Sequence, residues 1–325
     1  MLRKTVQDTT QRARQSQAIQ KITANYKLLP ASAEHGIRYI LWVADASYNK
    51  PKTAETKPKT FRDPFAKKNL EPDLFVTQLH GTHNLVLNKF SIVDEHVVLA
   101  TVEFAPQEQP LKAADFRAMW TATKGLDAFA FFNCGYESGA SQPHKHMQLM
   151  TYSSIKEITG LDMPPLLQFI DHKLREYPIS ETVWLPELPF CHFLHRLDLP
   201  NDIDSEKATA NIVVIYNKVL NQMNSTKYPN TPAQAGPSSA TLPLPVAYNM
   251  LLTSSYLFII PRKAQRFNGI EVNSIGFIGS FFVRNNEQRI FLETHDGPME
   301  LLRQVTFLPT PAYSGSGVQC MEKDS

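Results

Sequence analysis

The chain has 325 residues, of which 42% are hydrophobic and 20% are charged. This is ordinary globular composition, and the length allows one large domain or two smaller ones. A formal net charge of +2 is too small to select nucleic acid or an anionic membrane. No apolar run approaches the roughly 20 residues of a membrane span. We therefore expect neither a nucleic-acid partner nor a membrane partner.

The cysteines and the first segment bear on the compartment. Cys134, Cys191 and Cys320 give an odd count with no Cys-x-x-Cys, so we expect a reducing compartment without a disulfide framework or a structural zinc site. Residues 1–28 hold six basic residues against one acid, Asp8, a bias also found in mitochondrial targeting segments. We favour the simpler reading, a solvated helix, and predict a cytoplasmic protein, with the nucleus left open.

The first part of the chain predicts a helix and then several strands. Residues 1–28 contain no glycine or proline and predict a helix, and 35–46 predict a strand. Residues 48–75, rich in Lys, Pro and Thr, predict a long surface loop of the kind that often serves as a lid or binding loop. After this loop, strands are predicted over 83–87, 97–102 and 128–134, with a helix over 112–124.

The second part repeats the rhythm of helix, strand and Asn-bearing loop. Interleaved elements joined by short turns predict an α+β fold with a mostly antiparallel sheet. The shared rhythm suggests one domain of two duplicated halves, a catalytic half over about 30–160 and a second half over about 161–310. The predicted elements here are helices over 164–177 and 205–224, a strand over 190–195, a loop over 224–246, a hairpin over 247–262, a loop and strand over 273–283, and a disordered tail over 312–325.

Residues 139–150, GASQPHKHMQLM, carry the clearest chemical signal. On a strand, alternate side chains share a face, so His144, His146 and Gln148 would form a polar row. Met147 and Leu149 would point the other way, into a core. A polar row that follows a loop of small residues predicts a reactive surface.

The residue types in this row suit attack on phosphorus. Imidazole is largely neutral near pH 7 and becomes an effective nucleophile when its other nitrogen is hydrogen-bonded. We expect His146 to be the nucleophile, with His144 to orient or stabilise it. Donors for the phosphate oxygens would come from Gln148 and from the preceding loop, Gly139, Ala140, Ser141 and Gln142.

Two other interpretations of the row stay open on residue types alone. Alternate histidines could belong to a metal site, but no Cys, Asp or Glu lies at a convincing spacing to complete one, and we predict no metal ligands. The histidines could also be satisfied polar residues of a half-exposed strand. His96, His192 and His195 are interpreted as structural for similar reasons.

The longer string Asn133-Cys-Gly, Ser138-Gly-Ala-Ser-Gln and His144-Lys-His-Met-Gln148 resembles the histidine-triad superfamily. Within it, the similarity is to the galactose-1-phosphate uridylyltransferase-like branch that holds the diadenosine tetraphosphate phosphorylases, or ATP adenylyltransferases. Gln148 stands where hydrolases of the superfamily carry a third histidine. The resemblance implies a histidine-triad-like fold and cleavage of diadenosine tetraphosphate by phosphate to ATP and ADP, reversibly. It also implies a covalent adenylyl intermediate on His146.

The resemblance extends over about residues 38–285 and implies further substrate-binding positions. Asp63-Pro64-Phe65 and the 248–262 hairpin are other similar strings. Ile275 stands where a threonine is usual, Ser280 and Arg284 replace a methionine and a lysine, and Pro143 is also a departure. The substrate-binding residues implied are Lys50, Asn88, Lys89, Asn133, Gly139, Ala140, Ser141, Gln142, Gln148, Asn273, Ser274, Ile275, Ser280 and Arg284.

The same resemblance implies small-molecule partners only. These are diadenosine tetraphosphate, phosphate, ATP and ADP, with no protein-bound cofactor and with Mg²⁺ carried by the polyphosphate. Two halves in one chain predict a monomer. A uridylyltransferase and a non-catalytic dinucleotide sensor are the alternatives. The absence of Cys-x-x-Cys argues against the first, and the intact nucleophile His146 argues against the second.

Overall fold

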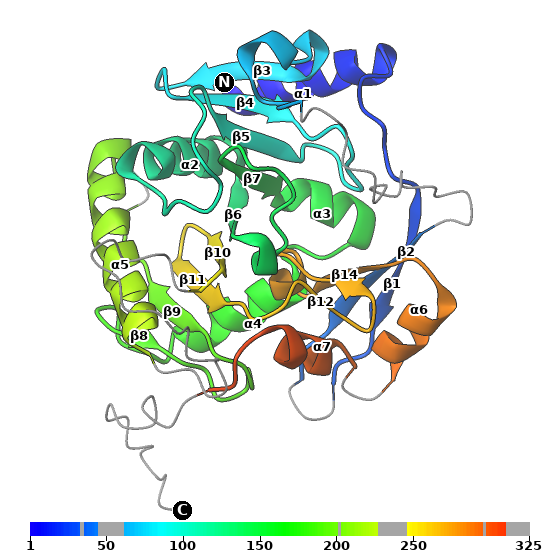
Figure 1. Cartoon of the computed structure of the whole chain (residues 1–325), viewed down its shortest axis with the longest axis vertical. Coiled ribbons are helices and arrows are strands. Elements are labelled where there is room, and N and C mark those ends of the chain that lie inside the picture. The colour runs from blue at the N-terminus through cyan, green and yellow to red at the C-terminus, as the bar shows by residue number, and fades with distance from the viewer. Residues whose placement is uncertain (33–35, 45–61, 201–202, 227–245, 295–296, 310–325) are drawn as a thin grey trace, which may run out of the picture.

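A single nine-stranded sheet runs through the molecule (Figure 1). The computed structural model describes residues 1–32, 36–44, 62–200, 203–226, 246–294 and 297–309. The strand order of the sheet is β3-β4-β5-β7-β6-β10-β11-β9-β8, with antiparallel pairing throughout. Its strands are β3 (Phe75–Leu79), β4 (His83–Leu87), β5 (Val97–Thr101), β6 (Ala128–Cys134), β7 (His146–Thr151), β8 (Thr182–Val183), β9 (Phe193–Arg196), β10 (Tyr248–Leu252) and β11 (Tyr256–Pro261).

Two smaller sheets and the helices complete the structure. Strand β14 pairs parallel to β2, and this is the only parallel pairing among the described residues. The smaller sheets hold β1 (Ala24–Leu29), β2 (Tyr39–Ala44) and β14 (Ser280–Val283), and β12 (Arg266–Phe267) with β13 (Ile270–Glu271). The helices are α1 (Leu2–Gln15), α2 (Ala113–Leu126), α3 (Tyr152–Thr159), α4 (Pro165–Leu174), α5 (Ser205–Ser225), α6 (Asn286–Glu293) and α7 (Gly297–Val305), with 3-10 turns η1 (Lys67–Asn69), η2 (Pro72–Leu74), η3 (Tyr136–Ser138) and η4 (Gly276–Ile278).

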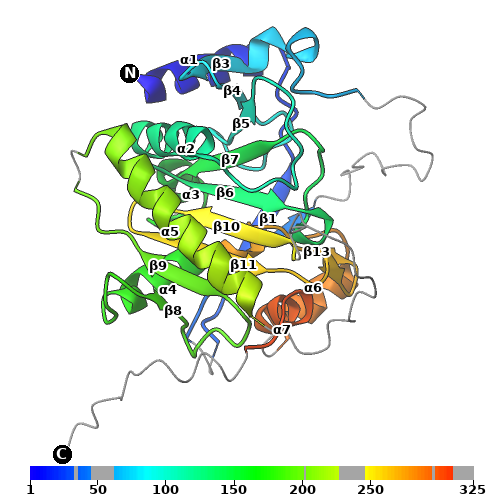
Figure 2. The same ribbon diagram turned by 60° about the vertical axis from the view of Figure 1, so that its left-hand side comes forward.

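The sheet separates two apolar cores. One core lies under α1, α2 and α5, and α2 and α5 pack side by side along one face of the sheet (Figure 2). The other lies between the sheet and the layer of β2, β14, α4 and α7. Met147 and Leu149 are fully buried in the first core, so the alternation predicted for the His-x-His strand is confirmed. Burial of these apolar faces is the main stabilising contribution.

The α+β fold with a mostly antiparallel sheet is confirmed. Inward from the edge strand β3 the order reads β4-β5-β7-β6, and from the other end it reads β8-β9-β11-β10, with α2 and α5 at equivalent places between their strands. The proposed duplication stays a prediction, and this symmetry supports it. The predicted tail and most of the 224–246 loop lie outside the described residues.

One predicted element is wrong. The helix predicted over 1–28 ends at Gln15, because Gln17 adopts a left-handed φ of 59° and Gln20 and Ile22 instead bond the carbonyls of Lys89 and Ser91. Tertiary pairing overrides the local pattern there. Of the loop predicted over 48–75, residues 48–61 lie outside the described residues, and the rest contains only the short turns η1 and η2 before the edge strand β3 begins at Phe75 and pairs with β4.

Candidate active site

His146 is held as a neutral imidazole with one nitrogen left to react. It opens β7, lies opposite Ala100 of β5, and is only 6% exposed. Its Nδ1 lies 2.8 Å from the His144 carbonyl oxygen, and because a carbonyl can only accept, Nδ1 carries the proton. Burial lowers the pKa of His146 to about 4. Nε2 therefore presents a lone pair at neutral pH.

His144 acts through its main chain and is itself clamped by its ring. Nδ1 lies 2.7 Å from Oδ2 of Asp63, and Nε2 lies 2.9 Å from both the carbonyl and the hydroxyl oxygen of Thr101. The ring is 1% exposed and faces away from the solvent. Fixing it fixes the His144 carbonyl, which sets the tautomer of His146. The orienting role expected for His144 stays a prediction, and this geometry supports it.

A relay of hydrogen bonds orients the side-chain amide of Gln148. The Phe90 N–H donates to Asn88 Oδ1 at 3.1 Å, so the Asn88 amide nitrogen points at His96 Nδ1, 3.2 Å away. His96 Nε2 then carries the proton and donates to Gln148 Oε1 at 2.9 Å. Burial lowers the pKa of His96 to about 4, which keeps this tautomer neutral. The amide nitrogen of Gln148 is left free to donate.

A pocket of about 280 Å³ opens over this row and brings together six of the predicted residues, Asn88, Lys89, Ser141, Gln142, His146 and Gln148. Apolar side chains such as Phe65 and Leu87 form much of its wall. The Phe65 ring centroid lies 5.1 Å from that of His146. Lys89 pairs with Glu71 at 2.8 Å, and Gln142 Oε1 has no partner among the described residues. The pocket combines an apolar wall with polar groups aimed inward, as ligand sites do.

Asn133 connects two distant segments of the chain to the end of β6. Its Oδ1 accepts three hydrogen bonds, from Asn249 Nδ2 and from the backbone N–H and hydroxyl of Ser274. Nδ2 of Asn133 has no partner in the described part of the chain and remains a donor. Arg262, buried and with its pKa lowered to about 9 by desolvation, bonds Asn249 and two loop carbonyls behind it.

The other predicted residues that the structure describes do not line this pocket. Gly139 passes so close to Asn273 that a Cβ on it would lie 2.9 Å from the Asn273 Cβ. Asn273 Oδ1 accepts the Ile275 N–H at 2.9 Å. Of the remaining predicted residues, Ser280 accepts a bond from the Trp42 indole, Arg284 pairs with exposed Glu271, Ala140 follows Gly139 in its loop, and Lys50 lies outside the described residues.

Several residues that hold the site were not predicted as site residues. Gln107, Thr101 and the guanidinium of Arg262 all reach it from loops or strand ends remote in sequence. They act through hydrogen bonds between distant segments, which no local pattern reveals. The only hint in the sequence is that Asn249 and Arg262, both polar, lie at the two ends of the predicted apolar hairpin.

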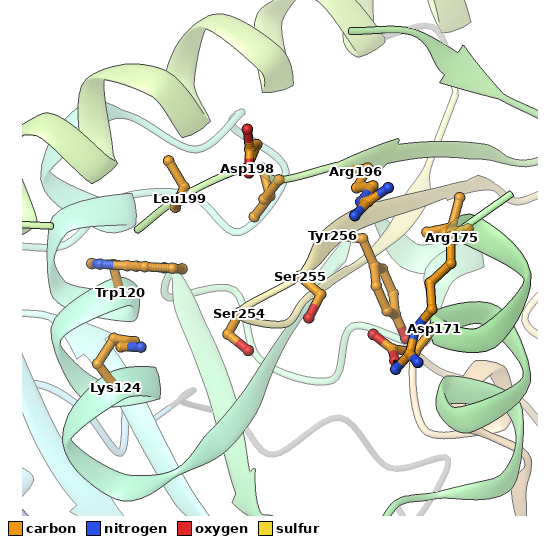
Figure 3. A pocket seen from close by; sticks show the side chains of 12 residues that line it. Trp120, Lys124, Asp171, Arg175, Arg196, Asp198, Leu199, Ser254, Ser255 and Tyr256 are labelled. Atoms are coloured by element: carbon orange, nitrogen blue, oxygen red, sulfur yellow. Dashed lines mark hydrogen bonds and ion pairs between the residues drawn. The ribbon is translucent and has the colours of Figure 1, made fainter. Parts of the chain in front are cut away.

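A second cavity of about 270 Å³ lies at the turn between β10 and β11, where α2, α4 and the end of β9 also line it (Figure 3). Lys124, Arg175 and Arg196 bring positive charge to it, and Asp171 and Asp198 bring negative charge. Its wall contains no histidine and none of the predicted site residues. The pocket over β7 is therefore the candidate active site.

Within the described ranges, no group of three or more His, Cys, Asp or Glu side chains is placed to hold a metal ion. The donors around His146 are imidazole, amide and backbone groups, which suit an anionic substrate. Among these same residues, no helix has both the length and the apolar character needed to cross a bilayer.

Comparison with known proteins points to one family. The family model described as Ap4A phosphorylase N-terminal domain matches residues 1–169, and the one described as ATP adenylyltransferase C-terminal domain matches residues 186–308. Diadenosine 5',5'''-P1,P4-tetraphosphate phosphorylase 2 of Saccharomyces cerevisiae is 28% identical over 256 residues, 74% of this chain and 74% of that protein. Protein APA1 of the same yeast is 25% identical over 235 residues, 69% of this chain and 67% of that protein.

Solved structures share the fold. The crystal structure of yeast Ap4A phosphorylase Apa2 in complex with Ap4A matches with a TM-score of 0.73 and 23% identity, covering 95% of this chain and 98% of that one. The complex with AMP matches with a TM-score of 0.71 and 24% identity over the same shares. The fold, the site and the family models together define a nucleotidyltransferase. The chain belongs to the Ap4A phosphorylase family, which confirms the resemblance drawn from residues 133–148.

Proposed function

We propose that this enzyme cleaves Ap4A with inorganic phosphate to give ATP and ADP, through an adenylyl group carried on His146. Family membership supports the overall reaction. The observation that carries the mechanism is the tautomer of His146: Nδ1–H donates to the His144 carbonyl and Nε2 is a free lone pair at the pocket. A neutral, oriented imidazole is what attack on phosphorus requires.

The first step forms the covalent bond. His146 Nε2 attacks one α-phosphorus of Ap4A, the bond to the bridging oxygen breaks, and ATP leaves. The adduct makes the imidazole ring cationic, and the bond from Nδ1–H to the His144 carbonyl strengthens as that charge develops. The Gln148 amide, oriented by His96, donates to a non-bridging oxygen of the transferred phosphoryl group.

The second step discharges the enzyme. A phosphate oxygen attacks the adenylyl phosphorus, the P–N bond breaks, and ADP leaves while His146 returns to its neutral form. Asn133 Nδ2, Ser141 and Gln142 are the further donors that we assign to the polyphosphate. Lys89 leaves its ion pair with Glu71 and binds oxygens of the polyphosphate. Any divalent cation arrives with the polyphosphate, and we keep the prediction of a cytoplasmic monomer.

Isotope-labelled phosphate tests the reaction. The enzyme is incubated with Ap4A and ³²P-phosphate, and the nucleotides are separated. The proposal predicts label in the β-phosphate of ADP and none in ATP, because phosphate accepts the adenylyl group. His146→Ala should lower the rate by more than about 10³-fold, whereas exposed His172→Ala should match the parent. Release of AMP without labelled ADP would contradict the proposal.

A further inference from the structure

The ladder between β6 and β7 stops two residues short of the nucleophile. The two strands pair from Ala128↔Thr151 to Phe131↔Gln148. Continued by two residues, the same register would place Asn133 opposite His146. That pair is absent, although β6 extends to Cys134 and β7 begins at His146. The gap therefore lies between His146 and Asn133, the two residues to which the proposed function assigns the attack on phosphorus and a donor for its oxygens.

The side-chain amide of Gln107 fills this gap. Its Oε1 accepts the His146 backbone N–H at 2.8 Å, and its Nε2 donates to the Asn133 carbonyl oxygen at 2.8 Å. In an unbroken antiparallel ladder, that N–H and that carbonyl would bond each other. Nε2 also approaches the His146 carbonyl oxygen at 3.2 Å. Gln107 is 1% exposed, so the amide replaces a ladder bond inside the protein.

Gln107 is itself held by the strand entry it supports. Its backbone N–H donates to the Pro143 carbonyl at 2.8 Å, and the Lys145 N–H donates to the Ala105 carbonyl at 2.7 Å. Pro106 and His144 form an isolated bridge between these two bonds. The amide therefore has one allowed position, set by the same segment that carries the histidines.

We propose that Gln107 is a positioning residue that holds His146 and Asn133 apart by the width of one amide. The separation makes room for the transferred phosphoryl group between the His146 Nε2 and the Asn133 Nδ2. Two residues further along the strands, Phe131 and Gln148 pair directly, and no phosphoryl group has to fit between them. The inference rests on the proposed function for the identity of the group transferred, but the spacing itself can be measured without substrate.

Removal of the amide should let the strands close. In Gln107→Ala, the His146 N–H and the Asn133 carbonyl lose their partners, and the direct ladder bond of about 2.9 Å satisfies both. The nucleophile then shifts toward β6. Because a misplacement near 1 Å costs about 10²-fold in rate, we expect kcat to fall about 100-fold with KM within about threefold of the parent. Gln109→Ala, exposed and two residues away, is the matched control.

The rate of the Gln107→Glu variant should depend on pH in a way that a purely structural role of Gln107 would not produce. An ionised carboxylate accepts from the His146 N–H but repels the Asn133 carbonyl. A protonated carboxyl group donates to that carbonyl and restores both bonds. The rate of this variant should therefore rise at least about tenfold as pH falls from 8 to 5.5, where His146, with its pKa of about 4, stays neutral. Gln109→Glu should show the parent profile.

A crystal structure of Gln107→Ala and the pH profile of Gln107→Glu together decide the inference. The expected result is a His146 N to Asn133 O distance near about 2.9 Å in the first and acid rescue in the second. An open gap in Gln107→Ala, or a Gln107→Glu profile parallel to the parent, would overturn it. If Gln107→Ala does not fold, Gln107→Met, similar in length but unable to bond, replaces it. A parent enzyme without phosphorolysis would instead refute the proposed function and leave the gap measurement valid.

Discussion

The carboxylate of Asp63 and the ring of His144 meet at 2.7 Å, although 81 residues separate them in the sequence. The opposite ring nitrogen bonds Thr101, whose hydroxyl donates to Glu103 and so can only accept from His144. Both ring nitrogens therefore donate, and the ring cannot turn without losing a bond. This relationship fixes the carbonyl that sets the tautomer of His146.

Asp63→Asn tests this chain of contacts. An amide keeps an acceptor but loses the charge that balances a ring donating from both nitrogens, so the His144 ring should reorient. We expect kcat to fall about tenfold with a smaller change in KM, measured by initial rates of phosphorolysis. Asp73→Asn, exposed on η2, is the control. Equal kcat in Asp63→Asn and in the parent would show that Asp63 does not position the nucleophile.

His96 should matter through Gln148. In His96→Leu, the Gln148 Oε1 loses its donor, so the amide can rotate and present oxygen instead of nitrogen to the phosphate. We expect kcat/KM to fall by about tenfold or more, since one charge-assisted hydrogen bond is worth about 1.5–3 kcal/mol. Steady-state kinetics beside His172→Leu provide the measurement. An unchanged kcat/KM in a folded His96→Leu enzyme would show that the hydrogen bond from His96 does not orient Gln148 for the reaction.

Gly139 is required by both conformation and close approach. Its φ is +84°, and a Cβ would lie 2.9 Å from the Asn273 Cβ and 3.0 Å from the Val272 carbonyl oxygen. Gly139→Ala should lower the free energy of unfolding by roughly 1–3 kcal/mol and push the 272–274 loop away from Asn133. Gly81→Ala shares a positive φ of 69° but meets nothing within 4 Å, so it isolates the backbone cost of about 1 kcal/mol. Equal losses in urea unfolding would contradict the close approach.

Buried histidines make stability depend on pH in a defined direction. Desolvation lowers the pKa of His96, His146 and His192 to about 4, whereas the unfolded chain titrates near 6.5. Between these values the unfolded state binds more protons, so the free energy of unfolding rises with pH from about 4 to 6.5 and then levels off. Calorimetry should show Tm lower by about 5 °C or more at pH 5 than at pH 7. A Tm constant over this window would show that these rings are solvated.

Much of the fold follows from local pattern. The predicted strands 83–87 and 128–134 agree residue for residue with β4 and β6, both of which are rich in branched or aromatic residues and buried along their whole length. The hairpin and helix α5 are also confirmed. Strand β1 was missed because most of it is exposed and it depends on pairing with β2. Helices α6 and α7 were missed because they are short, and the Asn285 N-cap that marks the start of α6 was not recognised.

Some residues of the candidate site could likewise be predicted from the sequence, and others could not. The strand row of His144, His146 and Gln148 could be predicted from alternation, and the pocket does bring His146 and Gln148 together. Gln107 and Asn249 could not, because each reaches the site through a side-chain bond across a gap in sequence of 26 residues or more. Such contacts form only when the sheet is assembled, and they produce no periodic pattern in the sequence.

Intact-protein mass spectrometry tests the central claim most directly. The enzyme is mixed briefly with Ap4A in the absence of phosphate and quenched at alkaline pH, where a phosphohistidine-type bond survives. We expect a mass increase of one adenylyl group, lost on addition of phosphate and absent in His146→Ala but present in His172→Ala. Turnover of Ap4A by the parent with no adduct, or an adduct that persists in His146→Ala, would contradict the assignment of His146 as the nucleophile.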